Sequence, residues 1–263
     1  MTAQLPARRR ADLLAFVRDR GQATVGELAE VLEVSLDTVR RDLEHLAREG
    51  SLTRTHGGAV PTGTLARHEN PLAVRMADHP DAKARIAARA AGYVRDGQTV
   101  VLNGGTTTLA VVNHLTDRRD LTIVTNNLMI PPALPEGVAR GVYVVGGSTR
   151  MRSLATVGRL RFPDAQGRTS LAVSADLAIV GVSTVSLDGV FGVSNLREAQ
   201  LLREMVDAGR TVVVLADSSK LDRTGFAHVC TAKEIDVFIT DAVLPRPLTT
   251  AFARAGVQVV LAR

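Results

Sequence analysis

Two short amphipathic patterns follow one another directly between residues 24 and 50, and they constrain the fold of this segment more than any other feature. In each pattern the apolar residues recur at spacings of three and four, so they share one helical face. These residues are Val25, Leu28, Ala29 and Leu32 in the first pattern and Leu36, Val39, Leu43 and Leu46 in the second. Thr24 and Ser35 stand where helix N-caps belong, and Gly50 stands where the second helix would end. Two short helices joined by a tight turn predict a helix-turn-helix, whose second helix enters the major groove of DNA.

The polar residues of the second helix and of the segment after it are the candidate DNA contacts. Thr38, Arg40 and Arg41 fall in the first two turns of that helix, where base edges and phosphates would be met. Beyond the helix, an alternating apolar and polar segment and a Gly-Gly turn predict a two-stranded wing that carries Arg54. The candidate DNA-binding residues are Ser35, Thr38, Arg40, Arg41, Arg54 and His56.

Charge does not by itself support DNA binding here. The chain has a net charge of +5, but residues 1–60 contain equal numbers of arginines and acidic residues. An alternative interpretation is therefore a small helical hairpin with a solvated face, in which Asp37, Asp42 and Glu44 pair with the arginines. Electrostatic attraction to DNA would require that the arginines gather on one side of the domain.

The whole string from residue 35 to residue 59 is more specific than a bare helix-turn-helix pattern. It has the form SxDTVRRDLxxLxxxGxLxRxHGGA. This string closely resembles the winged helix-turn-helix of DeoR-type bacterial transcriptional regulators. The resemblance implies a DNA-binding regulator, and specifically a repressor.

The rest of the chain has a different organisation. Residues 61–80 are rich in proline, glycine, histidine and charge without periodicity, which predicts a linker between a domain over residues 1–60 and one over 81–263. From residue 99 onward, short runs rich in β-branched residues alternate with helical patterns, which predicts an α/β fold with a mostly parallel sheet covered on both faces. The expected strands are 99–102, 121–125, 142–145, 176–180, 211–216, 237–240 and 257–261, with helices over 107–115, 195–208 and 248–255.

Glycines and polar residues follow several of these strands, at the carboxyl ends where ligands bind in parallel sheets. The loops are NGGTTT from residue 103, TNN from 125, GGSTR from 146 and DSSK from 217. Each loop alone is consistent with an ordinary turn or helix cap. Together they supply hydroxyls, backbone N–H groups, an amide and an ammonium, which suit a small phosphorylated polyol. Neither a Walker A loop nor a GxGxxG loop after a strand is present, which disfavours nucleotides.

These loops also resemble a known domain. NGGTTTLAV, TNN, GGSTRMRSLATVG, DLAIVGVS, LADSSKL and ITD occur in the order and spacing of the DeoR-type effector domain. The resemblance implies a fold similar to ribose-5-phosphate isomerase and a sensor of phosphorylated sugars. It implies that Gly105, Thr106, Thr107 and Lys220 hold phosphate, while other residues line the remainder of the site. The candidate effector-binding residues are Gly104, Gly105, Thr106, Thr107, Asn126, Gly147, Asp176, Asp217 and Lys220. Asn103 departs from the family pattern, in which an acidic residue or serine is common before the glycine.

An isomerase fused to a DNA-binding domain is the alternative function. Isomerisation of a sugar phosphate requires a carboxylate base, and the isomerases carry a DGAD segment where this chain has DLAIVGVS. Val180 and Ser183 stand where the two acids would be, and Glu198 is the one nearby acid. We therefore expect a sensor with no catalytic residue. A purely structural role would leave the recognition helix and the converging loops without an explanation.

Composition sets the remaining expectations. No apolar run is long enough to span a bilayer, and residues 1–20 are too charged for a signal peptide, so we expect a cytoplasmic protein without a membrane partner. Cys230 is the single cysteine, which excludes intrachain disulfides and thiolate-rich metal sites, and we expect no metal or cofactor. Reading an operator with paired half-sites requires two winged domains, so a homodimer or homotetramer is expected.

Overall fold

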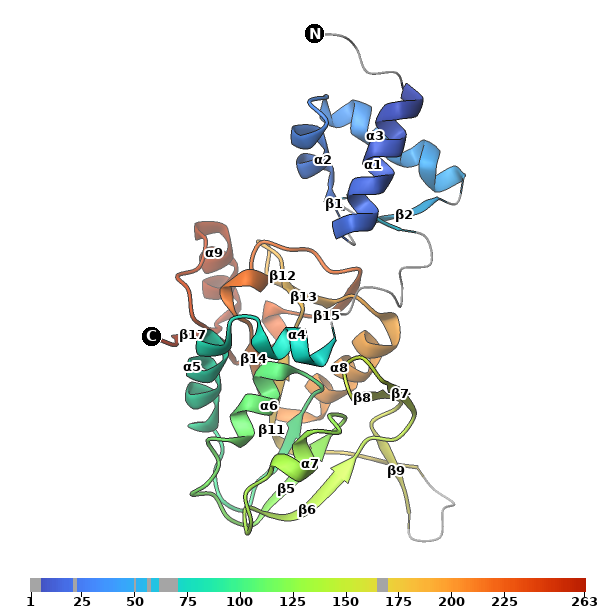
Figure 1. Ribbon diagram of the computed structural model, residues 1–263. Coiled ribbons are helices and arrows are strands. Elements are labelled where there is room, and N and C mark those ends of the chain that lie inside the picture. The colour runs from blue at the N-terminus through green and yellow to red at the C-terminus, as the bar shows by residue number, and fades with distance from the viewer. Residues whose placement is uncertain (1–5, 21–22, 50, 56–57, 62–70, 165–169) are drawn as a thin grey trace. The chain divides into compact units, whose positions relative to one another are not determined.

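The chain divides into two units, Met1–His68 and Glu69–Arg263, and each is described by itself (Figure 1). The structure is a computed structural model. It describes residues 6–20, 23–49, 51–55, 58–61, 71–164 and 170–263.

The first unit is a winged helix-turn-helix. Its elements are α1 (Pro6–Arg20), β1 (Ala23–Thr24), α2 (Val25–Val31), α3 (Leu36–Arg48), β2 (Leu52–Thr55) and β3 (Gly58–Pro61). The three strands form an antiparallel sheet in the order β1-β3-β2, with β2 and β3 as the wing. Both predicted N-caps are confirmed, because Thr24 forms a capping box with Glu27 and the Ser35 hydroxyl accepts from the Thr38 amide. The helix-turn-helix and the wing are therefore formed as predicted.

The core of this unit is built from the predicted apolar faces, except that Leu36 at the start of α3 is 48% exposed. Leu28 of α2 and Leu43 of α3 are almost fully buried and pack with Leu13 of α1. Asp42 of α3 is also buried, because the Arg9 guanidinium holds its carboxylate at Nε–Oδ2 2.6 Å and Nη2–Oδ1 3.3 Å. Since a buried carboxylate requires a partner, this bidentate pair fixes α1 against α3.

The second unit contains a seven-stranded parallel sheet. The strands run in the order β17-β16-β14-β11-β4-β5-β6, and every neighbouring pair is parallel. Their bounds are β4 (Thr99–Leu102), β5 (Leu121–Thr125), β6 (Ala139–Val144), β11 (Ala175–Gly181), β14 (Gly209–Leu215), β16 (Val237–Thr240) and β17 (Gln258–Leu261). All the predicted strands are present, and the α/β class is confirmed.

Helices cover the two faces of this sheet, and side chains alternate between the faces along each strand. On β14, Val212 and Val214 pack into one cluster and Val213 and Leu215 into the other. The first cluster includes α8 (Leu196–Ala208) and α9 (Arg246–Ala255), and the second includes α5 (Pro80–Ala91) and α6 (Thr106–Val112). Burial on both faces explains why these strands form near-continuous apolar runs in the sequence.

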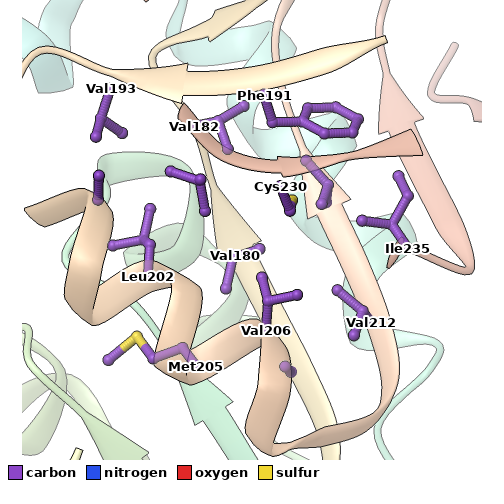
Figure 2. Close-up of a cluster of buried hydrophobic side chains, with 14 of the residues drawn as sticks. Val180, Val182, Phe191, Val193, Leu202, Met205, Val206, Val212, Cys230 and Ile235 are labelled. Atoms are coloured by element: carbon purple, nitrogen blue, oxygen red, sulfur yellow. The ribbon is translucent and has the colours of Figure 1, made fainter. Parts of the chain in front are cut away.

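Figure 2 shows part of the first cluster, where Leu202 and Val206 of α8 lie near Val180 of β11 and Val212 of β14. Cys230 lies in the same cluster, and burial raises the pKa of its thiol to about 12. Cys230 is therefore a packed apolar residue with a protonated thiol at neutral pH.

Several short elements lie outside the parallel sheet and were not predicted. A three-stranded antiparallel sheet has the order β12-β13-β15, and two hairpins pair β7 with β8 and β9 with β10. The bounds are β7 (Ser148–Arg150), β8 (Ala155–Val157), β9 (Arg161–Pro163), β10 (Ser170–Ala172), β12 (Thr184–Val185), β13 (Val190–Val193), β15 (Ala227–Thr231) and the short helix α7 (Ile130–Ala133). None of the helices in the described parts of the chain combines the length and apolar character that a membrane span requires.

The segment predicted to be a linker contains a helix. The two units divide within residues 61–80, and α4 (Leu72–Ala77) lies in the second unit. This helix was not predicted, because its six residues are too few to establish a helical period. Residues 71–80 therefore fold with the α/β unit.

Candidate functional site

The exposed face of α3 carries the candidate DNA contacts. Val39 and Leu43 point into the core, and Arg40 and Arg41 are exposed between them. The Ser35 hydroxyl lies 2.9 Å from the Thr38 hydroxyl as well as capping the helix, so Ser35 fixes the start of the helix. The recognition helix thus presents Arg40 and Arg41 on the side opposite its core, where Asp37 and Glu44 are exposed as well.

The two arginines differ in their surroundings. The Arg40 guanidinium lies 3.0 Å from the Asp37 carboxylate, an exposed pair that contributes little and can be exchanged for a phosphate. Arg41 is exposed and has no ion pair among the residues that the structure describes. Arg54 lies on β2, where its backbone pairs with Ala59, while its side chain and all of His56 lie outside the described residues. Arg41 is therefore more available to DNA than Arg40.

Replacing Arg41 with alanine is expected to weaken operator binding by about 1–3 kcal/mol if its guanidinium contacts a base edge. The measurement is a titration of labelled DNA at several salt concentrations. Arg41→Lys is the matched variant, because it keeps the charge and removes the bidentate fork.

If Arg41 contacts phosphate instead, Arg41→Ala lowers affinity on all sequences and reduces the salt slope by about 1, while Arg41→Lys restores much of the binding. Unchanged affinity and salt dependence in Arg41→Ala would remove this residue from the interface.

In the second unit, a pocket with a cavity volume of about 70 Å³ lies at the carboxyl ends of β4, β11 and β14. One water requires about 10–15 Å³ on this measure, so the cavity has room for a small ligand group. Its lining comprises residues 103–107 after β4, 181–183 at the end of β11, 215–217 and Lys220 after β14, and Arg75, Asp78, Lys83 and Glu198. Gly104, Gly105, Thr106, Thr107, Asp217 and Lys220, all predicted for the effector site, thus line one pocket.

The loop after β4 is shaped by glycine and by one buried amide. A Cβ on Gly104 would lie 2.6 Å from the Cβ of Ala155, so only glycine fits there. The Asn103 side chain donates to the Gly181 carbonyl at 2.9 Å and accepts from the Gly181 amide at 2.8 Å. A carboxylate could only accept, so the asparagine that departs from the family pattern ties the β4 loop to the end of β11.

The loop after β14 presents Lys220 through a short 3-10 turn, η2 (Ser218–Lys220). Asp217 is buried and caps this turn, because its carboxylate accepts from the Ser219 amide at 3.0 Å. Asp241, directly after β16, accepts from the Ser218 amide at 2.7 Å. The loop of Lys220 is therefore held by its own first residue, Asp217, and by Asp241 after the neighbouring strand β16.

Lys83 is a second lysine in the pocket, and its position there was not predicted. It is 7% exposed, and its ammonium donates to the carbonyl oxygens of Arg75, at 2.5 Å, and Asp78. Burial lowers the pKa of Lys83, with Asp217 and Asp78 acting in the opposite direction and Lys220 and Arg75 adding to the decrease. A bound anion would favour the charged ammonium at this position.

Acidic groups also line the pocket, and one of them is held by an arginine. Glu198 at the start of α8 lies 2.6 Å from the Arg150 guanidinium of β7, and both side chains are largely buried. Glu198 is the acid that the sequence places near the end of β11, and this pair holds its carboxylate in the pocket wall. Ser183 lines the pocket and Val180 is fully buried. Neither side chain is an acid, so the two positions provide no carboxylate base.

The structure does not bring three predicted residues to the pocket lining. Asp176 lies at the start of β11, where its carboxylate accepts from the Thr99 amide at 2.9 Å, so it is at the opposite end of the strands. Gly147 has a φ of 116° and packs so closely on Val157 that a Cβ would lie 2.4 Å from that carbonyl oxygen. The Asn126 side chain packs against Gly104, and its amide nitrogen donates to the Thr156 carbonyl at 2.7 Å.

Three of the charged residues that line the pocket were not predicted, and the sequence contains only weak indications of them. Lys83 is one of few lysines in an arginine-rich chain, but its position on a helix did not indicate a pocket. Arg75 and Asp78 fall in the segment interpreted as a linker. Within the described residues, no group of three or more His, Cys, Asp or Glu side chains is arranged to hold a metal.

Comparison with known proteins gives consistent matches along the chain. Residues 9–62 match the DeoR-like helix-turn-helix domain, and residues 78–242 match the DeoR C terminal sensor domain. The transcriptional repressor AccR of Agrobacterium fabrum is 33% identical over 89% of each protein. The glycerol-3-phosphate regulon repressor of Escherichia coli is 30% identical over 89% of this chain and 90% of its own length. Among solved structures, ribose 5-phosphate isomerase from Plasmodium falciparum matches 53% of this chain and 52% of its own at 15% identity, with a TM-score of 0.35.

Proposed function

The chain belongs to the DeoR family of transcriptional regulators, and we propose that it represses genes of carbohydrate metabolism until a small phosphorylated metabolite binds in its pocket. The observation that carries this proposal is the convergence of Arg75, Lys83 and Lys220 on one pocket of the sensor unit. In the absence of metabolite, the winged unit binds operator DNA through α3.

The mixed chemistry of the pocket favours a ligand with two different ends. The three cations and the hydroxyls of Thr106 and Thr107 suit a phosphate, since hydrogen bonds between charged groups are the strong ones. Carboxylates accept hydrogen bonds from hydroxyl groups, so Asp78 and Asp217 suit a polyol or sugar. A phosphorylated polyol satisfies both ends.

A regulator accounts for this site better than an isomerase does. Proton transfer beside a carbonyl requires a carboxylate base within reach of the substrate. Val180 and Ser183 provide none. Of the carboxylates in the pocket, Glu198 is held by Arg150, Asp217 accepts from the Ser219 amide, and Asp78 lies 3.5 Å from His79. The curated relatives are repressors, which agrees with the absence of a base at these positions.

Two further features belong to the proposal. An operator with paired half-sites requires two winged units, so we infer that the chain acts as a homodimer or homotetramer. A regulator that binds chromosomal DNA and senses metabolites acts in the cytoplasm.

The proposal predicts binding without turnover. In calorimetric titrations of the full chain, at least one of glycerol 3-phosphate, ribose 5-phosphate and fructose 6-phosphate is expected to bind. Its dephosphorylated counterpart is expected to bind at least about tenfold more weakly, because a charged hydrogen bond contributes about 1.5–3 kcal/mol.

Chromatography of the same mixtures should show no isomer of the added sugar phosphate. Formation of the aldose or ketose partner above the level seen with Lys220→Ala would establish an isomerase. Equal binding of the phosphorylated and dephosphorylated compounds would refute the phosphate site.

A further inference from the structure

One wall of the pocket is contributed by the segment that follows the DNA-binding unit in sequence. Arg75 of α4 and Asp78 directly after it line the pocket. α4 is the first element described after the wing strand β3, and residues 62–71 join the two. A ligand in the pocket therefore contacts the same stretch of chain that leads to the winged unit.

The C-terminal end of α4 is held by a pocket residue. The last carbonyl groups of a helix lack partners within the helix. The Lys83 ammonium satisfies the carbonyl oxygens of Arg75 and Asp78. An ammonium has three N–H groups, and the third has no partner among the described residues, so it is available to a ligand anion.

The N-terminal end of α4 is held by a hairpin that is tied to the opposite wall. The Leu72 amide donates to the Arg152 carbonyl at 2.8 Å, in the turn between β7 and β8. Arg150, in the same hairpin, pairs with the pocket residue Glu198. Both ends of α4 are thus connected to side chains that line the pocket.

The junction between α4 and α5 is held in an unusual conformation. His79 has a φ of 48°, in the left-handed region that residues other than glycine rarely adopt. Such a conformation persists where the surrounding contacts impose it. The Lys83 hydrogen bonds to residues 75 and 78, immediately before this junction, are contacts of that kind.

We propose that α4 transmits pocket occupancy to the DNA-binding unit, with the Lys83 ammonium and the Leu72–Arg152 hydrogen bond as its two links to the pocket. An anion that binds the third N–H group of Lys83 and the Arg75 side chain adds a link between the ligand and the end of α4, so the ligand prefers one arrangement of this helix. Under the proposed function the ligand releases DNA, so reciprocal linkage requires that this arrangement has the lower affinity for DNA. This inference rests on the proposed function.

The N-terminal link can be removed without breaking the helix. Leu72 is the first residue of α4, a position where proline is well tolerated because its missing N–H has no partner within the helix. Leu72→Pro therefore removes the bond to Arg152, while Leu72→Ala removes the side chain and keeps the bond. Leu72 does not line the pocket, so both variants should keep the parent's affinity for ligand.

The experiment uses the full chain and an operator fragment selected from a random DNA library by the parent protein. The probe is the sugar or glycerol phosphate that the parent binds most tightly among the three above. In the parent and in Leu72→Ala, saturating probe is expected to lower operator affinity roughly 5- to 150-fold. In Leu72→Pro, we expect less than about twofold release, with unchanged probe affinity and unchanged operator affinity without probe.

A second measurement requires no variant. Hydrogen exchange of peptides covering residues 71–80 in the parent is expected to change when the probe is added. The role of α4 would be overturned if the probe released Leu72→Pro from the operator as fully as it releases the parent. It would also be overturned if the probe released the parent without changing hydrogen exchange in residues 71–80. A parent that no probe releases would refute the proposed function itself, and the inference with it.

Discussion

Lys220→Ala is expected to bind operator DNA as tightly as the parent and to remain bound when the effector is added. Lys220 lines the pocket on a turn fixed by Asp217 and Asp241, and it lies in the sensor unit, so its loss leaves the winged unit intact. Removing a hydrogen bond to a charged group costs about 1.5–3 kcal/mol, which lowers effector affinity roughly 10- to 150-fold. In cells this variant would keep its target genes repressed.

The measurement is operator affinity at an effector concentration that just saturates the parent. Lys233→Ala is the matched control, because Lys233 is an exposed lysine outside the pocket lining. Release of Lys220→Ala at the parent's effector concentration would show that Lys220 does not hold the phosphate. Loss of operator binding without effector would show that the residue serves folding or assembly.

Phe238→Ala is expected to destabilise the sensor unit by about 3–5 kcal/mol, the usual cost of truncating a buried phenylalanine. The Phe238 ring is fully buried and lies 5.0 Å from the Phe252 ring and 5.9 Å from the Phe191 ring, measured between centroids. Its strand, β16, leads to Asp241, which holds the loop of Lys220. The variant should therefore lose stability and a well-formed pocket together.

Thermal unfolding of the sensor unit should show a decrease in melting temperature of roughly 6–20 °C, since 1 kcal/mol corresponds to about 2–4 °C at this size. Val243→Ala serves as control, because Val243 is 80% exposed and its truncation removes little packing. A decrease of less than about 2 °C for Phe238→Ala would contradict the packing described for this cluster.

The elements that the sequence predicted are those with a strong local signal. The seven parallel strands are buried on both faces, so each one is a run of apolar and β-branched residues. The helix-turn-helix was found through its caps and its apolar spacing. The short antiparallel strands, such as β12 with two residues, are too brief to establish an alternating pattern.

The candidate site was predictable only where it follows a strand in sequence. Gly104 and Lys220 come directly after predicted strands, and both line the pocket. Arg75 and Lys83 lie on α4 and α5, which precede the sheet in sequence. A hydrogen bond from the Lys83 ammonium to the Arg75 carbonyl joins them, and hydrophobic periodicity cannot reveal such a bond. Asp176 was assigned to the site through the family resemblance alone, and its position at the start of β11 puts it at the end of the strand opposite the pocket.

Release of the full chain from its operator is the most direct test of phosphate-responsive repression. A fluorescent operator fragment, selected from a random library by the chain, is titrated with protein at increasing concentrations of each phosphorylated compound and its dephosphorylated counterpart. We expect one phosphorylated polyol to lower operator affinity roughly 5- to 150-fold, while its dephosphorylated form does not. Failure to select any specific DNA, or equal release by both forms, would contradict a phosphate-responsive repressor.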